Sequence, residues 1–345
     1  MKSINTFFIC LILGLNSAVA TDYYQPKDYG SESLYSPFSN FLSYTFDVLQ
    51  LPDNFGTGNF SKNAEAVTNH LLNPNQSIEN EGGYQRFVNR QIFPIDFKHN
   101  NDSYAALPNY ALHMLGGGMV YRKDLEWFRK NNYKYPILSA STIAMSAEFI
   151  QEVFEKNTTA DDDEIADMLI FRPLGIALFH NDKFANFFME QFNPAIWPSL
   201  QAYDINKQKI ANAGIHYVYR PKIANYGNTG LFIYTGINNM LGLSHKLDPE
   251  HSLSWATGLS TQKIDLNSAQ QAQLKHSLGF FYDRNKSLLA SLVINDSGGN
   301  RFRFNLYPTN QSYLGKFGYF ITQNMQNEIT AGIVYKIQFG IGFSS

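Results

Sequence analysis

One histidine and three acidic residues lie in helix-like parts of this sequence. Glu148 and Asp167 have small or apolar neighbours, and burying an unpaired carboxylate is costly, so partners such as Arg172 and His113 are expected. A histidine that meets carboxylates from other helices could bind a divalent metal, with His113, Glu148, Glu152 and Asp167 as candidate ligands. His113, Glu148 and Asp167 could equally be catalytic, as general acid and base for hydrolysing an ester. The third possibility is a buried polar network that holds helix crossings in register.

Three long segments with helical spacing must position these residues. They cover residues 104–129, 136–156 and 163–192, and they show little β alternation. In the second segment, one stripe at helical spacing carries Ser141, Met145, Glu148, Glu152 and Glu155. Glu152 and Glu155 could lie on a solvated face, whereas Glu148 has apolar and small neighbours.

Local signals predict where the third helix begins and breaks. Asp161, with Glu164 three residues later, fits a helix start. Pro173 should break or restart the helix, because proline lacks a backbone donor and clashes with the preceding turn. Pro194 and Pro198 close the segment.

Three consecutive glycines, Gly116 to Gly118, follow His113 in the first segment. Each glycine costs a helix about 1 kcal/mol relative to alanine. The run makes sense where another backbone approaches closely, as in small-residue helix crossings. The alternative is that the glycines end one helix and begin a turn.

The order of these residues resembles a family of uncharacterised bacterial envelope proteins. The family has a helical core, distantly similar to VanZ-like proteins, and the resemblance implies a C-terminal β-barrel after it. It covers residues 105–179 and rests on His113, Gly117, Tyr121, Glu148, Glu152, Asp167, Pro173 and Gly175. Ala147 stands where the pattern has tryptophan, and Glu164 where it has serine. The resemblance gives weight to these residues without implying a reaction.

From residue 214 onward the pattern becomes β. Eight candidate strands are separated by turn signals: 214–220, 229–239, 251–260, 274–283, 287–295, 301–307, 314–322 and 328–343. In the last run apolar residues occupy every second position from Ile329 to Phe343, with small or polar residues between them. A soluble strand usually has ~5–6 residues, so this long run favours a tilted strand that crosses a bilayer.

The predicted fold class is therefore α+β, with a helical subdomain followed by an antiparallel outer-membrane-type β-barrel of about eight strands. Small or polar residues on one face suit a crowded barrel interior, and apolar residues on the other suit contact with lipid. Alternation cannot distinguish inside from outside, so a soluble barrel or sandwich stays open. The helices should pack on or inside the periplasmic end of the barrel. An enclosed helix would require further strands from residues 40–100.

The N-terminus and the composition favour an exported protein. Lys2, the apolar run from Phe7 to Leu15 and the small residues Ala18 and Ala20 predict a signal peptide. Cys10, the only cysteine, lies within it, which excludes disulfides and cysteine-based sites from the mature chain.

The mature chain is also predicted to lack both a basic surface and an apolar spanning helix. Without Lys2 the net charge is 26 − 29 = −3, which does not suggest nucleic acid as a partner. Aromatic residues make up 15% of the chain and charged residues 16%, a composition that fits lipid-facing or interfacial surface. Because no stretch offers 18 uninterrupted apolar residues, any membrane span must be built from strands.

The expected organisation is a signal peptide over 1–20, an irregular lead over 21–103, a helical subdomain over 104–200 and the barrel over 201–345. The expected location is the outer membrane, with its lipid as the partner and the helical part facing the periplasm. No sharp catalytic motif is present and no cofactor is required by the sequence. A structural, assembly or small-ligand-binding role is favoured. A hydrolase acting on lipid or cell-wall material and a soluble periplasmic binding protein are the alternatives.

Overall fold

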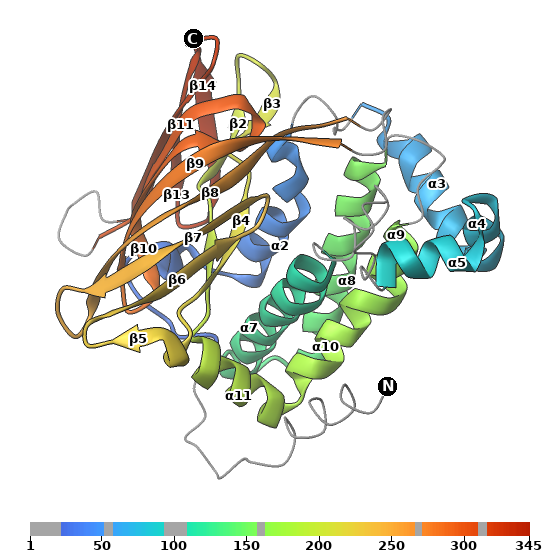
Figure 1. Cartoon of the computed structure of the whole chain (residues 1–345), viewed down its shortest axis with the longest axis horizontal. Helices are drawn as coiled ribbons and strands as arrows, with labels where there is room; N and C mark the ends of the chain where they lie inside the picture. The colour runs from blue at the N-terminus through green and yellow to red at the C-terminus, as the bar shows by residue number, and fades with distance from the viewer. Residues whose placement is uncertain (1–21, 52–57, 93–108, 157–162, 266–270, 310–315) are drawn as a thin grey trace.

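The computed structural model describes residues 22–51, 58–92, 109–156, 163–265, 271–309 and 316–345 (Figure 1). The expected signal peptide, Cys10 and Asp161 therefore lie outside the described residues. The described chain is α+β, because helical segments precede a large, mostly antiparallel sheet. This part of the predicted fold class is confirmed.

The region expected to be an irregular lead is mostly helical where it is described. Its elements are η1 (Ser31–Leu34), α2 (Pro37–Thr45), η2 (Asp47–Gln50), α3 (Phe60–Leu72), α4 (Pro74–Asn80), α5 (Gly83–Phe87) and η3 (Val88–Ile92). The Ser36 side chain caps α2 by accepting a hydrogen bond from the Ser39 amide, and Pro37 and Pro74 lie in the first turns of their helices. Proline suits a first turn, where its missing N–H is not needed, so Pro37 and Pro74 both mark helix starts.

The three predicted helical segments are present, with breaks. They comprise η4 (Asn109–Gly116), α7 (Gly117–Lys130), α8 (Pro136–Glu155), α9 (Asp163–Ala166), η5 (Asp167–Phe171), α10 (Arg172–His180) and α11 (Asp182–Phe192). Pro173 lies in the first turn of α10, where π-helical geometry changes to α-helical geometry, but the backbone stays helical at Phe171 and Arg172, so the helix is not broken there. The segments η4 and η5 are π-helical, a widened geometry that is rare and often found at functional sites.

The sheet contains 14 strands among the described residues. They are β1 (Ala195–Pro198), β2 (Gln201–Asp204), β3 (Lys209–Ala211), β4 (Ile215–Tyr219), β5 (Asn225–Tyr226), β6 (Thr229–Thr235), β7 (Asn238–Lys246), β8 (His251–Asp265), β9 (Gln271–Arg284), β10 (Ser287–Asp296), β11 (Asn300–Leu306), β12 (Phe317–Asn324), β13 (Ile329–Tyr335) and β14 (Phe339–Ser344). Strands β6 to β14 pair antiparallel in sequence order. At the two ends of this run, β4 joins β6 to β1, and β2 pairs with β14 in parallel.

The prediction of a closed barrel of about eight strands is wrong. The sheet is a curled half-barrel, and six strands were missed: β1, β2, β3, β5, β7 and β14. The long final run is a hairpin of β13 and β14, with a turn where Lys336 has a φ of +63°. The sequence pattern did not show this turn, because both strands have apolar residues on their outward face and the two-residue alternation continues unchanged across the turn. The described part of residues 40–100 supplies no strand.

The two faces of the sheet differ sharply in chemistry. One row of cross-strand partners runs over β6 to β14 and is entirely apolar: Leu231, Leu243, Trp255, Phe280, Leu292, Phe304, Ile321, Ala331 and Phe343. A row on the opposite face is mostly small or polar: Ser244, Ser254, Phe281, Ser291, Asn305, Phe320, Gly332 and Gly342. Phe343 is 55% exposed and Phe281 is 1% exposed, so the apolar row faces outward.

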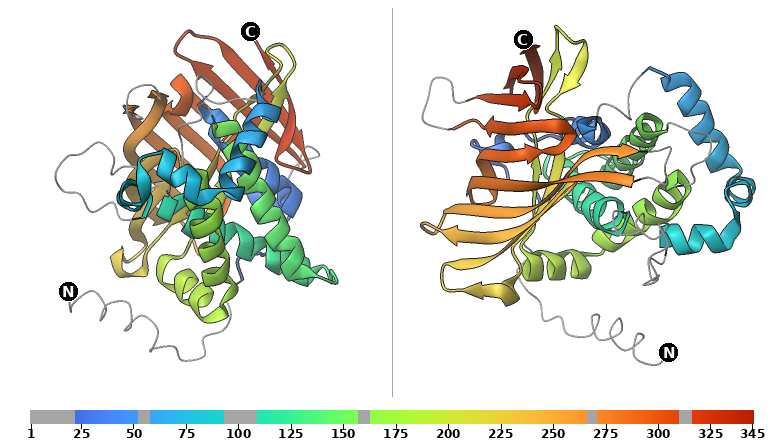
Figure 2. Two further views of the ribbon diagram at one scale, coloured as in Figure 1. Left: turned by 90° about the vertical axis from the view of Figure 1, so that its right-hand side faces the viewer. Right: turned by 45° about the horizontal axis from the view of Figure 1, so that its top comes forward.

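The helices lie on the inner side of the sheet, opposite the apolar row (Figure 2). In Figure 1, α2 lies between the sheet and α8. One buried cluster joins α2, α7, α8, α10 and α11 to β1 and β4, through residues such as Tyr44, Phe179 and Tyr217. A second cluster fills the inner side of the curled sheet around Trp197, Phe281 and Phe320.

Candidate functional site

The structure brings His113, Glu148 and Asp167 together from three helical elements, η4, α8 and η5. Nδ1 of His113 is hydrogen-bonded to Oε1 of Glu148, and Nε2 of His113 lies 3.7 Å from Oδ2 of Asp167. All three residues are buried, with exposed fractions of 7%, 0% and 3%. The predicted convergence of a histidine with acids is therefore present, and the π-helical segments η4 and η5 both contribute to it.

Glu148 has two further partners. The Tyr44 hydroxyl donates to its Oε2 at 2.8 Å, and Nε of Arg172 lies 3.3 Å from the same oxygen. Arg172 also donates to the Ala144 carbonyl oxygen from Nε and Nη2. The expectation that His113 and Arg172 would be partners of the buried acids is met at Glu148. Tyr44 was missed, because α2 is 104 residues away in sequence and carries no local signal of a site.

Glu152 is not on a solvated face. Its exposed fraction is 2%, and its Oε1 has no hydrogen-bond partner among the described residues. Oδ1 of Asp167 is likewise without a partner there. Single ligand atoms of His113, Glu148 and Glu152 lie within 4.8 Å of one another. The four residues singled out as metal-ligand candidates therefore form one buried cluster, in which two carboxylate oxygens are unsatisfied.

The charged groups of this cluster shift one another's pKa values. Burial lowers the pKa of His113, but the carboxylates of Asp167 and Glu148 outweigh burial and raise this pKa to about 10. Burial raises the pKa of Glu148, but His113 and Arg172 outweigh it, so the pKa is lowered. Burial holds the pKa values of Glu152 and Asp167 well above their usual range, with neighbouring acids adding to the effect. Glu148 is therefore the stably charged acid of the group.

A second acidic group adjoins the first through Glu152. Ligand atoms of Glu152, Asp163 and Glu164 lie within 4.8 Å of one another. Glu164 already has cationic partners, since Nζ of Lys156 lies 2.6 Å and Nδ1 of His70 lies 2.7 Å from its Oε1. These partners were not foreseen from the sequence, where Glu164 was read as part of a helix start.

The three glycines make room for the cluster and for a helix crossing. A Cβ atom on Gly117 would lie 1.7 Å from Nη1 of Arg172, and one on Gly116 would lie 2.4 Å from the Tyr217 ring. A Cβ atom on Gly118 would lie 2.8 Å from the Gly175 carbonyl oxygen. Helix η4 continues into α7 across these glycines. The interpretation as a close approach is confirmed, and the alternative of a helix end is wrong.

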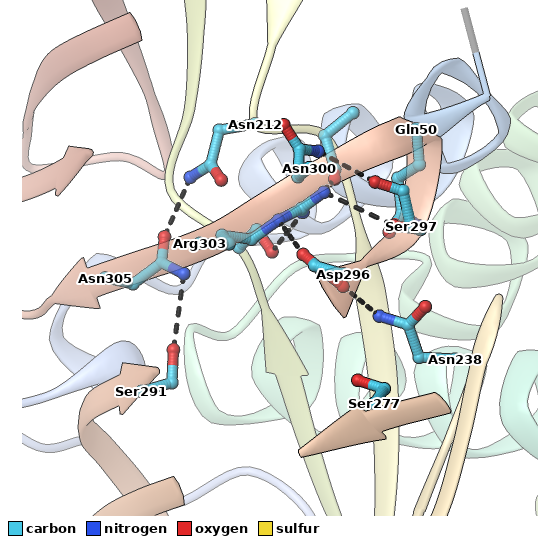
Figure 3. Close-up of polar contacts among 12 residues, drawn as sticks. Gln50, Asn212, Asn238, Ser277, Ser291, Asp296, Ser297, Asn300, Arg303 and Asn305 are labelled. Carbon is cyan, nitrogen blue, oxygen red and sulfur yellow. Dashed lines mark hydrogen bonds and ion pairs between the residues drawn. The ribbon is translucent and has the colours of Figure 1, made fainter. Parts of the chain in front are cut away.

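A separate polar network lies on the inner side of the sheet (Figure 3). Arg303 is 3% exposed, forms an ion pair with Asp296, and donates to the Ala213 carbonyl oxygen at 2.6 Å. Asn238 donates to Asp296, and Asn212 donates to Asn305 at 2.7 Å. Most of these groups pair with one another, as expected of a structural network, whereas Oδ1 of Asn212 and Oδ1 of Asn238 have no hydrogen-bond partner among the described residues.

Two surface pockets in the described part of the chain lie away from the histidine–carboxylate cluster. One is lined by Tyr121, Ser141, Pro173, His180 and nearby apolar side chains, and the Tyr121 hydroxyl lies 2.8 Å from Nδ1 of His180. The other lies between the start of the described chain, β1 and Lys286. Neither pocket is lined by His113, Glu148 or Asp167.

Comparison of the chain with protein-family models, with curated proteins and with solved structures gives no match. Among the described residues, none of the helices combines the length and the hydropathy that a membrane span requires.

Proposed function

We propose that this protein is an outer-membrane envelope protein with a non-enzymatic role, in structure, assembly or the binding of a small ligand. The observation that carries the proposal is the apolar outward face of the sheet. Nine consecutive cross-strand partners from Leu231 to Phe343 are apolar, and several are large and well exposed.

Water is a poor solvent for such a face. Trp255, Phe280 and Ile321 are 39%, 41% and 43% exposed, on three different strands. A soluble protein rarely exposes a contiguous apolar patch of more than a few hundred Å², and larger patches mark membrane or protein contacts. Small and polar residues on the inner face complete the pattern of outer-membrane strands. A soluble barrel would place the apolar face inward, so this alternative has the weaker support.

Burial of the histidine–carboxylate cluster favours a non-enzymatic role. A hydrolase needs a route by which an ester reaches its acid and base, and the two pockets described above do not include these residues. Convergence of His113, Glu148 and Asp167 is what supports the alternative of an envelope hydrolase. Their small exposed fractions argue against it.

Fluorescence quenching tests the membrane proposal. The chain has three tryptophans, so single-tryptophan chains can retain either Trp255 on the sheet or Trp127 on α7. After reconstitution into vesicles of lipids with brominated acyl chains, Trp255 should be strongly quenched and Trp127 should not be. Equal quenching of the two, or recovery of the full chain in the soluble fraction of cells lysed without detergent, would contradict the proposal.

A further inference from the structure

We propose that the histidine–carboxylate cluster binds one divalent transition-metal ion, with His113, Glu152 and Asp167 as ligands and Glu148 as the residue that orients His113. The inference concerns the helical part of the chain and does not depend on where the protein is located. It is argued from the contacts of each ring nitrogen and each carboxylate.

The two nitrogens of His113 have different surroundings. Nδ1 is bonded to Glu148, so the Nδ1–H donates to this carboxylate and Nε2 is the nitrogen that would give up its proton to a metal. Histidines that bind metals commonly donate their other ring N–H to a carboxylate, which fixes the tautomer and the ring orientation. Glu148 is itself held by Tyr44 and Arg172. The imidazole is thus positioned to offer Nε2 as a ligand.

The distance between Nε2 and Asp167 fits two ligands of one ion. Nε2 lies 3.7 Å from Oδ2 of Asp167, which is too long for a hydrogen bond. Metal–ligand bonds of about 2.0–2.2 Å at a tetrahedral angle place two ligand atoms roughly 3.3–3.6 Å apart. A small shift of either side chain therefore brings both atoms into coordination distance.

Unsatisfied oxygens provide an independent observation. Oε1 of Glu152 and Oδ1 of Asp167 have no hydrogen-bond partner among the described residues, although the two residues are only 2% and 3% exposed. Buried polar atoms normally have partners, and an unsatisfied one calls for an explanation such as an ion. Glu152 has a ligand atom within 4.8 Å of both His113 and Glu148, so it borders the cluster and must turn towards Nε2 to join Asp167 on one ion.

The charges balance with an ion of charge +2. Glu148 is matched by Arg172, at 3.3 Å, and His113 is neutral when it coordinates a metal. On binding an ion, Glu152 and Asp167 would lose their protons, and their two carboxylates would supply the two negative charges that match it. One imidazole and two carboxylates are hard or intermediate ligands, which suit Zn²⁺, Mn²⁺ or Fe²⁺ and exclude an ion that requires thiolates.

Metal titration of the purified full chain tests this site. After treatment with a chelator and desalting, the wild-type protein should bind one equivalent of Zn²⁺, and Co²⁺ in its place should give a visible absorption spectrum with nitrogen and oxygen ligands. The variants Glu152→Gln and Asp167→Asn keep the side-chain size and remove a ligand charge. Each should lose the bound equivalent, whereas Glu65→Gln, on the exposed face of α3, should keep it.

Glu148→Gln separates orientation from ligation. Its amide oxygen can still accept from His113, so Zn²⁺ binding should persist with an affinity weakened by about 10–100-fold. A wild-type chain that binds less than a tenth of an equivalent of Zn²⁺, Mn²⁺ and Co²⁺ would overturn the proposal. So would full retention of metal by both Glu152→Gln and Asp167→Asn. Loss of metal counts in favour only for variants whose helical circular dichroism equals that of wild type.

Discussion

A Cβ atom on Gly117 would lie 1.7 Å from Nη1 of Arg172, the guanidinium that holds Glu148. The same Cβ position lies 2.9 Å from Cζ and 3.3 Å from Cδ of Arg172, which is fully buried, so more than the tip of the side chain must move. We expect Gly117→Ala to displace the guanidinium and break its ion pair with Glu148. The free energy of unfolding should fall by about 3–5 kcal/mol, the usual cost of breaking a buried ion pair.

The loss is measurable from urea unfolding followed by helical circular dichroism. Gly58→Ala is the matched control, because nothing lies within 4 Å of the Cβ position of Gly58. Equal stability of Gly117→Ala and Gly58→Ala would mean that Arg172 has an alternative position and that Gly117 is not needed for the ion pair.

Gly175→Ala should open the crossing between η4 and α10. The added Cβ atom would lie 2.3 Å from the carbonyl oxygen of Met114, and a backbone atom cannot move aside as a side chain can. The two helices must separate, so we expect proteases to cut the helical part of the variant several-fold faster than the wild type. Unchanged proteolysis relative to Gly58→Ala would contradict this reading of the crossing.

Asp124→Asn should make the stability of the protein less sensitive to a rise in pH between the two pKa values of Asp124, 3.8 and about 7. Burial raises the pKa of Asp124 to about 7 despite hydrogen bonds from Tyr35 and Asn40. A carboxyl group whose pKa is raised on folding contributes most below its unfolded pKa of 3.8, and this contribution is lost as pH rises towards 7. The wild type should therefore lose up to about 1.4 kcal/mol per pH unit over this range from this group.

The asparagine variant keeps an oxygen that accepts from Tyr35 and Asn40, but it cannot ionise. Urea midpoints should be measured at pH 5, 6, 7 and 8. The midpoint of the variant should increase relative to that of the wild type as pH rises, and the difference should become constant above pH 7. Parallel curves over the whole range would show that Asp124 is already ionised, and stabilised as such, in the folded protein.

Ile321→Arg tests the outward face of β12. If this face contacts lipid near the bilayer midplane, the arginine should cost about 2–4 kcal/mol and reduce the amount of protein in membranes. If the face contacts water, the same change should alter stability by less than ~0.5 kcal/mol. Leu72→Arg, at a 73% exposed position on α3, is the control and should change neither quantity.

Much of the order of elements could be predicted from local patterns. The helices around His113, Glu148 and Asp167 follow from helical spacing, whereas the break expected at Pro173 did not occur, because the backbone stays helical from η5 into α10. Alternation correctly located most strands from β4 to β14, because side chains on a strand alternate between two chemically different faces. These predictions depend only on neighbours within a few residues.

The number of strands needed information that alternation does not carry. Apolar residues continue at every second position across the turn between β13 and β14, so the sequence pattern indicated one strand where there are two. Strands β1 and β2 are short, β1 begins after Pro194 and ends with Pro198, and their pairing with β4 and β14 depends on partners farther along the chain. Closure of the sheet is a property of the whole assembly and was predicted wrongly for this reason.

The sequence by itself determined which residues of the candidate site are chemically unusual: an acid such as Glu148 amid apolar neighbours must find partners, because burying a lone charge is costly. Only the tertiary structure decided that Tyr44 and Arg172 hold it, that Glu152 is buried with an unsatisfied oxygen, and that the apolar face of the sheet points outward. The alternation of side chains along a strand shows that the two faces of the sheet differ. Which face points outward depends on which of them the helices cover.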